Sequence, residues 1–311
     1  MRRCVGVDLG GTTVKLGIVG VNGAVFEKWE IPTRTENNGL NIFPDIAASI
    51  REHVSEEELK SPEFAGVGMG VPGPVQEDGY TEKLVNLHMK DINVADLLSG
   101  LLGKVEVKAC NDADAAALGE LWMGAGKGYH SLMFITLGTG VGGGLVLDDK
   151  VVTGTRGMAG EIGHMTVNPE EYEKCNCGNH GCLEQYASAT GIVNVMKRTL
   201  AECDDPSCLR GLETFSCKDV LDAAKAGDIV ADRSVRTSMD YLALAMANIA
   251  MLADPEVFVI GGGVSRAGQY LLDCIEPVFA RLTPLSEKKA DIVIASLMND
   301  AGLYGAAKLV L

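Results

Sequence analysis

The sequence has 311 residues and a formal net charge of −15, from 27 basic and 42 acidic side chains. At ~150 residues per domain this length predicts two domains, and the 47% of hydrophobic residues excludes a chain that is disordered throughout. The acidic balance argues against a nucleic-acid partner bound through broad basic patches. The apolar runs are shorter than the ~18 residues of a membrane span, and a strand pattern follows Arg3 where a signal sequence would be apolar. We therefore expect a cytoplasmic protein with no membrane partner.

The first part of the chain alternates strand and helix patterns. Glycine turns at Gly10-Gly11 and Asn22-Gly23 punctuate three apolar runs, and the second is a strong hairpin signal. Apolar residues at helical spacing predict a helix over residues 40–54. The further expected strands and helices are 4–9, 15–21, 25–31, 65–71 and 105–109 (strands) and 94–102 and 113–122 (helices). Strands that alternate with helices indicate an α/β fold.

The second part of the chain begins like the first. A buried strand over residues 132–137 ends in Gly138-Thr139-Gly140, and a strand returns near 145–147. This segment can be laid over Val7–Thr12, which gives an internal repeat of about 128 residues and favours two duplicated domains over a solenoid. The later expected elements are strands at 257–260 and 292–295 and helices at 185–200, 217–226, 231–252, 267–282 and 301–309. Without a low-complexity linker, the domain boundary is expected near Cys110.

Much of the excess of glycine, 38 residues in all, falls into turns that follow strands. Gly138–Gly143 matches G-x-G-x-x-G, but a strand follows it instead of a helix, so the dinucleotide-binding interpretation fails. What remains is a pair of turns whose backbone N–H groups can approach phosphates. Nearby polar groups would help: hydroxyls of Thr12, Thr13 and Thr139, the charge of Lys15, and an Asp8 carboxylate suited to Mg²⁺. The two turns together predict a clamp on the phosphates of a nucleotide.

Three cysteines form the strongest local motif. Cys175, Cys177 and Cys182 supply three thiolates, and zinc takes four nitrogen or sulfur ligands in a tetrahedron. His180 inside the loop is a fourth ligand that spacing alone allows, and His164 lies eleven residues upstream of the loop. Four protein ligands leave no position for water, so the zinc would be structural.

The pair Asn111-Asp112 stands between a predicted strand and a predicted helix. An aspartate at a helix start is most often a cap. The sequence alone favours the cap.

These motifs, in this order, resemble the ROK family (repressor, open reading frame, kinase) of sugar kinases, within the actin/hexokinase superfamily. The matching segments run from residue 5 to about residue 305 and are Asp8–Thr12, Asn111-Asp112, Gly138–Gly144, Glu161–His164, Cys175–Glu184 and Gly261–Val264. Their similarity is greatest to bacterial glucokinases. The resemblance implies an α/β fold of two duplicated actin/hexokinase-like (ribonuclease H-like) domains with a cleft between them. The smaller N-terminal lobe would comprise residues 1–110 and 298–311, and the larger lobe, with the zinc loop, residues 111–297.

The resemblance also implies roles for particular residues. Asp112 would be the catalytic base that accepts the proton of the sugar hydroxyl. The sugar ligands would be Gly73, Asn111, Asp112, Glu161, His164 and Glu184, and the zinc ligands His164, Cys175, Cys177 and Cys182. The nucleotide and its Mg²⁺ would be bound by Asp8, Gly10, Gly11, Thr12, Thr13, Lys15, Gly138, Thr139, Gly140, Gly261, Gly262 and Gly263.

The implied activity is ATP-dependent phosphorylation of a hexose at its 6-hydroxyl, first of all glucose to glucose 6-phosphate. N-acetylmannosamine kinase is the alternative, followed by fructokinase or mannokinase, because the sugar ligands are shared. A sugar-responsive repressor of the same family carries an N-terminal helix-turn-helix region. In this sequence Asp8 already lies in the first expected strand, so we rank the repressor lower. An actin-like binding or structural protein is disfavoured by the Asn-Asp pair. The expected cofactors are ATP, Mg²⁺ and structural Zn²⁺, and the expected assembly is a homodimer or homotetramer.

Overall fold

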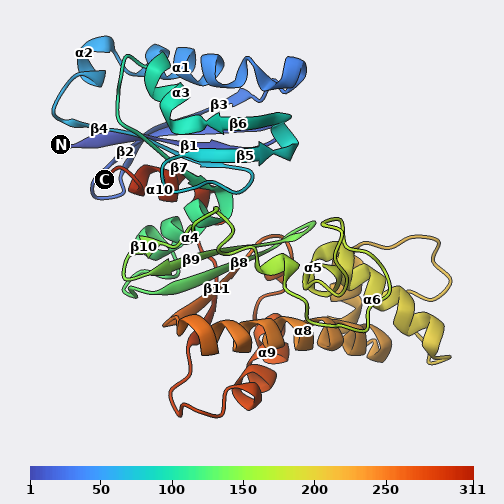
Figure 1. The fold of residues 1–311 in the computed structure, drawn as a ribbon. Coiled ribbons are helices and arrows are strands. Elements are labelled where there is room, and N and C mark those ends of the chain that lie inside the picture. The colour runs from blue at the N-terminus through green and yellow to red at the C-terminus, as the bar shows by residue number, and fades with distance from the viewer. The chain divides into compact units, whose positions relative to one another are not determined.

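A computed structural model describes all residues 1–311, which form two five-stranded sheets and one two-stranded sheet (Figure 1). The chain divides into two compact units, each made of separated segments. Unit 1 comprises Met1–Phe134, Gly144–Gly160 and Ser296–Leu311, and unit 2 comprises Ile135–Gly143 and Glu161–Ala295. The lobes expected from the sequence, 1–110 with 298–311 and 111–297, stay a prediction.

The first sheet has the strand order β3-β2-β1-β4-β7. β1, β2 and β3 are antiparallel neighbours, whereas β4 runs parallel to both β1 and β7. The strands are β1 (Arg3–Leu9), β2 (Thr13–Gly20), β3 (Val25–Pro32), β4 (Phe64–Val71) and β7 (Val107–Asn111). The helices of unit 1 are α1 (Ile42–His53), α2 (Glu56–Leu59), α3 (Val94–Leu101), α4 (Asp112–Met123) and α10 (Ala301–Lys308).

Helices cover both faces of this sheet (Figure 1). Val5, Val7 and Leu9 of β1 are fully buried in a core that also contains residues of α1 and α3. The alternate residues of β1 face α10, where a Cβ on Gly6 would lie 2.5 Å from the backbone oxygen of Leu303. Between Cys4 and Val7, β1 is therefore apolar on both faces, as expected of a central strand.

The second sheet repeats the strand order of the first, as β10-β9-β8-β11-β12. Its strands are β8 (Leu132–Leu137), β9 (Val141–Leu147), β10 (Lys150–Val151), β11 (Val257–Gly261) and β12 (Asp291–Ile294). Each sheet places three consecutive strands in reverse order beside two later ones. The shared order confirms the α/β fold of two duplicated sheets that the internal repeat predicts.

Unit 2 carries a set of packed helices beside the second sheet. They are α5 (Glu184–Ala187), α6 (Ala189–Glu202), α7 (Cys217–Lys225), α8 (Ile229–Ala253) and α9 (Gln269–Leu282). The long α8 begins where the Asp228 carboxylate accepts hydrogen bonds from the N–H groups of Val230 and Ala231. It ends at Asp254, which adopts the left-handed conformation. No helix of the structure is both long and apolar enough to cross a bilayer.

Some elements escape the sequence pattern. The hairpin of β5 (Tyr80–Leu84) and β6 (Met89–Asn93) and the one-turn helix α2 were not expected. The hairpin's outward residues are charged, and a 3-10 turn over Val85–Leu87 joins its strands, so neither alternation nor a glycine turn marks it. The strands and helices that the sequence predicts are all present.

Candidate functional site

The turn after β1 in unit 1 exposes backbone. Gly11 and Thr12 are exposed, and a Cβ on Gly11 would meet nothing within 4 Å. The N–H of Gly10 donates to the Thr13 oxygen over 3.0 Å, which closes the turn. Asp8, just before the turn, has a side chain 20% exposed, with the Lys15 amine 3.7 Å away. Burial raises the pKa of Asp8, and the charge of Lys15 partly offsets this effect.

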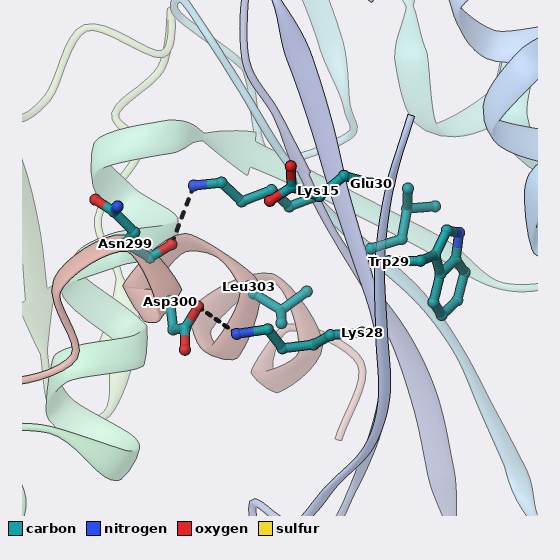
Figure 2. A pocket seen from close by; sticks show the side chains of 8 residues that line it. Lys15, Lys28, Trp29, Glu30, Asn299, Asp300 and Leu303 are labelled. Atoms are coloured by element: carbon teal, nitrogen blue, oxygen red, sulfur yellow. Dashed lines mark hydrogen bonds and ion pairs between the residues drawn. The ribbon is translucent and has the colours of Figure 1, made fainter. Parts of the chain in front are cut away.

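Lys15 also lies at the edge of a small cavity, of about 350 Å³, between β2, β3 and the start of α10 (Figure 2). Its amine donates to the backbone oxygen of Asn299 over 3.2 Å. Lys28, from β3, pairs with Asp300 over 2.7 Å (Figure 2). Both amines of this cavity are therefore engaged by oxygens of the chain itself, and nothing marks it as an anion site. The expected role of Lys15 toward a nucleotide stays a prediction.

Asn111 and Asp112 lie where β7 ends and α4 begins. Asn111 is the N-cap, and its side-chain oxygen accepts from the Ala113 N–H over 2.8 Å. Its amide group donates to the oxygen of Gly73 over 3.0 Å, and Gly73 has a φ of 138°, which a side chain would disfavour. The Asp112 carboxylate accepts from the same Ala113 N–H over 2.8 Å and is exposed. The capping function thus falls to Asn111, and Asp112 is accessible to a substrate.

Glu184 and the second glycine turn meet within unit 2. The carboxylate of Glu184, the first residue of α5, accepts from the N–H of Val141 over 3.1 Å. A Cβ on Gly140 would lie 2.2 Å from that carboxylate oxygen, so only glycine leaves room for it. The start of α6 fixes the rest of the turn, since Ala189 N–H donates to the Gly138 oxygen over 2.8 Å. Thr139 remains exposed at the tip.

The three glycines after β11 differ in their surroundings. Gly262 has a φ of 83°, and its Cβ would lie 2.5 Å from the backbone oxygen of Leu137 at the end of β8. Gly263 is exposed, and a Cβ there would meet nothing. The packing of β11 against β8 explains Gly262, whereas Gly263 leaves backbone accessible.

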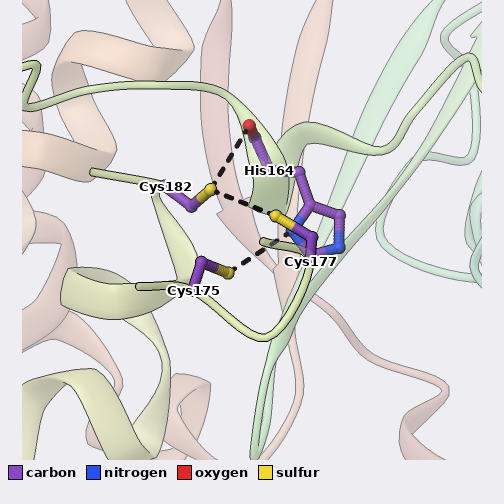
Figure 3. Close-up of side chains that lie close together, drawn as sticks. All are labelled: His164, Cys175, Cys177 and Cys182. Carbon is purple, nitrogen blue, oxygen red and sulfur yellow. Dashed lines mark hydrogen bonds between the residues drawn. The ribbon is translucent and has the colours of Figure 1, made fainter. Parts of the chain in front are cut away.

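His164, Cys175, Cys177 and Cys182 converge in unit 2 (Figure 3). Their ligand atoms all lie within 4.8 Å of one another. Cys175 Sγ is 3.8 Å from His164 Nδ1, and Cys177 Sγ is 3.6 Å from Cys182 Sγ. A tetrahedron with metal–sulfur bonds of about 2.3 Å has edges of about 3.8 Å, so the four side chains fit a zinc ion. His180 is not part of this group.

The three thiols of this cluster differ in the direction in which their pKa is shifted. Burial raises the pKa of Cys175 and raises that of Cys182 to about 12. The exposed Cys177 instead has a lowered pKa, because the backbone N–H of Asn179 donates to its sulfur. A metal that binds here must displace the thiol protons, so its affinity rises with pH.

A backbone bridge brings His164 to the cysteine loop. Thr166 pairs with Cys182, and the N–H of Leu183 donates to the Met165 oxygen over 2.9 Å. His164 itself ends a 3-10 turn whose first carbonyl belongs to Glu161, because the His164 N–H donates to the Glu161 oxygen over 3.1 Å. Both side chains are half-buried in unit 2.

A buried carboxylate network, which sequence reasoning missed, supports this loop. Glu171, with a side chain 2% exposed, accepts from the Tyr186 hydroxyl and from Arg198, each over 2.6 Å. Arg198 also binds Glu173 over 2.8 Å. Burial alone would raise the pKa of Glu171, but the bonds from Tyr186 and Arg198 outweigh it and lower the pKa to about 2. The network ties the segment before Cys175 to α5 and α6.

The structure thus groups the sequence-predicted residues into two sets. Unit 1 holds Asp8, Gly10, Gly11, Thr12, Thr13, Lys15, Gly73, Asn111 and Asp112. Unit 2 holds Gly138, Thr139, Gly140, Glu161, His164, Glu184, the three cysteines and Gly261, Gly262 and Gly263. A buried Glu120 in α4 is a further charged residue that no motif marks.

The two sheets with the same strand order form the α/β fold of the actin/hexokinase-like sugar kinases. The ROK family model matches residues 4–311, and the chain belongs to the ROK family. A glucokinase of Halalkalibacterium halodurans is 42% identical to it over 99% of this chain and 95% of its own. A glucokinase of Thermotoga maritima is 36% identical over 99% of this chain and 97% of its own. The crystal structure of a ROK family glucokinase from Streptomyces griseus, in complex with glucose and AMPPNP, superposes with a TM-score of 0.72 at 33% identity, covering 99% of this chain and 98% of that one.

Proposed function

We propose that this protein is an ATP-dependent hexokinase that transfers the γ-phosphoryl group to the 6-hydroxyl of glucose. The observation that carries the proposal is the exposed Asp112 at the start of α4, beside an Asn111 that is fixed to Gly73. It occurs in a chain 42% identical, over nearly its whole length, to a glucokinase.

Asp112 is the general base in this proposal. Its carboxylate accepts the proton of the attacking sugar hydroxyl as the oxygen–phosphorus bond forms. The Asp112 carboxylate is held at the first turn of α4 by the N–H of Ala113. Asn111 keeps the position of Asp112 by binding both the Ala113 N–H and the Gly73 oxygen.

The sugar is bound by side chains that can each pair with hydroxyls. Asn111 with the backbone of Gly73 serves from unit 1, and Glu161, His164 and Glu184 from unit 2. Carboxylates accept hydrogen bonds and an amide both donates and accepts, so the set suits vicinal hydroxyls. Since Glu184 also accepts from the Val141 N–H, the same carboxylate links the sugar to the glycine turn.

The nucleotide is assigned to the exposed backbone of the two glycine turns and of Gly263, with hydroxyls from Thr12, Thr13 and Thr139. The assigned set also includes Gly10, Gly11, Lys15, Gly138, Gly140, Gly261 and Gly262. Asp8 is assigned to hydrated Mg²⁺, which would neutralise charge on the phosphates of ATP when bound. A chain of net charge −15 offers ATP no general attraction, so these local donors are required.

The zinc in this proposal is structural. His164, Cys175, Cys177 and Cys182 would hold the ion, which would fix the orientation of the His164 ring, and the other ring nitrogen is assigned to the sugar. We further propose a cytoplasmic homodimer or homotetramer in which residues 1–110 with 298–311 and residues 111–297 are the two lobes.

An ADP-release assay across glucose, mannose, fructose, N-acetylglucosamine and N-acetylmannosamine tests the proposal. Glucose should give the highest kcat/KM, and a higher value for N-acetylmannosamine would replace it as the substrate. Asp112→Asn should lower kcat by about a thousandfold while glucose binding, followed by calorimetry, is kept. Asp96→Asn, which alters an acid in the first turn of α3, is the matched control. Near-normal turnover of Asp112→Asn would rule out Asp112 as the base.

A further inference from the structure

Glu120 is a fully buried acid in the helix that begins with Asp112. Its side chain forms no ion pair with any basic residue of the chain, although burying a charge is unfavourable unless hydrogen bonds or an opposite charge compensate for the lost water. The negative charge is instead held by hydrogen-bond donors of the backbone.

Those donors come from two separate segments. One carboxylate oxygen accepts from the N–H of Leu297 over 2.8 Å, and the other from the N–H groups of Ala125, over 2.8 Å, and Ser296, over 3.2 Å. The Ser296 hydroxyl lies 3.4 Å from the second oxygen. A Cβ on Gly124 would lie 2.0 Å from that oxygen, so glycine there leaves the carboxylate its space.

Ser296 and Leu297 occupy a special place in the chain. Unit 2 ends at Ala295, and unit 1 resumes with Ser296. From here the chain leads into α10, in which a Cβ on Gly302 would lie 2.9 Å from the Asp8 carboxyl carbon. Glu120 therefore joins the helix that carries Asp112 to the segment that packs against Asp8.

A second contact between α4 and α10 makes this junction stiff. A Cβ on Gly305 would lie 1.5 Å from the Ala115 oxygen, and one on Gly119 would lie 2.1 Å from the Ala301 oxygen. The two helices touch through their backbones at Gly119 and Gly305, while the Glu120 carboxylate holds the segment that leads into α10. Trp122, on α4, contacts Tyr304 of α10 edge-to-face with ring centroids 6.2 Å apart.

We propose that Glu120 is a positioning residue for phosphoryl transfer, whose charge fixes the separation of Asp112 and Asp8. The inference rests on the proposed function, which assigns the sugar hydroxyl to Asp112 and the nucleotide to Asp8. Each of these side chains keeps its own local contacts when Glu120 changes. Loss of the clamp therefore loosens their alignment more than it weakens the binding of either substrate, and alignment acts mainly on kcat.

The test compares Glu120→Gln with Glu58→Gln. Glu58 also accepts a backbone N–H, that of Ser55 over 3.2 Å, but in the capping box of α2. Glutamine at 120 keeps the shape, removes the charge and turns an NH₂ group toward N–H donors. We expect kcat for glucose to fall by about tenfold, because small misplacements of reacting groups act on kcat. The KM for glucose and the KM for ATP should each stay within about twofold of the wild-type value. Glu58→Gln should leave all three unchanged.

Amide hydrogen exchange gives a readout that does not depend on activity. In Glu120→Gln without substrates, the amides of Ser296, Leu297 and Ala125 should exchange about tenfold faster, because a lost hydrogen bond to a charged group is worth more than 1.4 kcal/mol. Unchanged exchange at these amides, or faster exchange with an unchanged kcat, would overturn the positioning role.

Gly124→Ala provides a second variant if Glu120→Gln does not fold. Gly124 has a φ of −109° and a ψ of −146°, and a Cβ there would lie 2.0 Å from the Glu120 carboxylate oxygen and 2.9 Å from the Glu120 Cα, so alanine would push the carboxylate aside while the charge remains. It should lower kcat in the same way, and normal kcat would overturn the inference. Wild-type protein that phosphorylates none of the hexoses would instead refute the proposed function. An active wild type with an unimpaired Glu120→Gln would refute only the role of Glu120.

Discussion

Glutamine in place of Glu171 removes the negative charge from the buried network that supports the cysteine loop. The pKa of Glu171 is lowered from 4.5 to about 2. At about 1.4 kcal/mol for each pKa unit, this lowering corresponds to about 3 kcal/mol of folding free energy at neutral pH. Because the side chain is only 2% exposed, solvent screens this contribution little. We expect Glu171→Gln to reduce the free energy of unfolding by about this amount at pH 7.

The same lowering fixes a pH dependence. A carboxyl whose pKa is lower in the folded state stabilises the protein fully above its unfolded pKa of 4.5 and loses this effect as the pH falls toward about 2. The difference between wild type and Glu171→Gln should therefore shrink from about 3 kcal/mol at pH 7 to about 2 kcal/mol at pH 3.5. Urea unfolding followed by circular dichroism at a series of pH values measures this difference.

Glu173→Gln is the matched control. Glu173 binds the same Arg198, over 2.8 Å, but its side chain is 51% exposed. A surface ion pair contributes about 1 kcal/mol or less, so the control should lose little stability. Equal losses in the two variants, or a loss in Glu171→Gln that does not change between pH 7 and pH 3.5, would refute the reasoning.

Three further changes test other parts of the structure. Cys177→Ser should reduce the zinc content from about one ion per chain to well below it, as measured by metal analysis of purified protein; metal-free, active wild type would contradict the site. Gly305→Ala should destabilise the protein by about 3 kcal/mol in urea unfolding through its clash with Ala115, whereas Gly100→Ala, which meets nothing, should stabilise it slightly. Glu184→Gln should raise the KM for glucose by about tenfold or more, since a hydrogen bond to a charged group is lost; an unchanged KM would remove Glu184 from the sugar ligands.

The elements that the sequence predicts best are those whose pattern is local. β1 and β8 are apolar runs closed by glycine turns, and their likeness predicts the repeated strand order that the two sheets have. The β5–β6 hairpin could not be found in this way, because its residues Glu82, Lys83 and Lys90 are exposed and charged. Its two strands are held by pairing with each other, and the residue pattern does not indicate that pairing.

The metal cluster shows how far the sequence alone can predict the residues of a site. Spacing predicts that the three cysteines converge but leaves His180 and His164 open as partners. The backbone pairing of Thr166 with Cys182 selects His164, and pairing between segments has no signature in residue type. Glu120 is harder still, since its partners are backbone N–H groups that every residue but proline carries, two of them 176 and 177 positions away.

The glycines of this chain serve two different needs, and the structure separates them. Gly11 and Gly263 leave exposed backbone with nothing near a Cβ, which fits the close approach of a ligand. Gly68, by contrast, would place a Cβ 1.6 Å from the Ala306 oxygen, and Gly305 one 1.5 Å from the Ala115 oxygen. These buried glycines let α10 lie directly on the first sheet and on α4. The glycine excess therefore reflects a tightly packed helix junction as well as turns with exposed backbone, and in the proposed role of Glu120 this junction keeps Asp8 and Asp112 aligned.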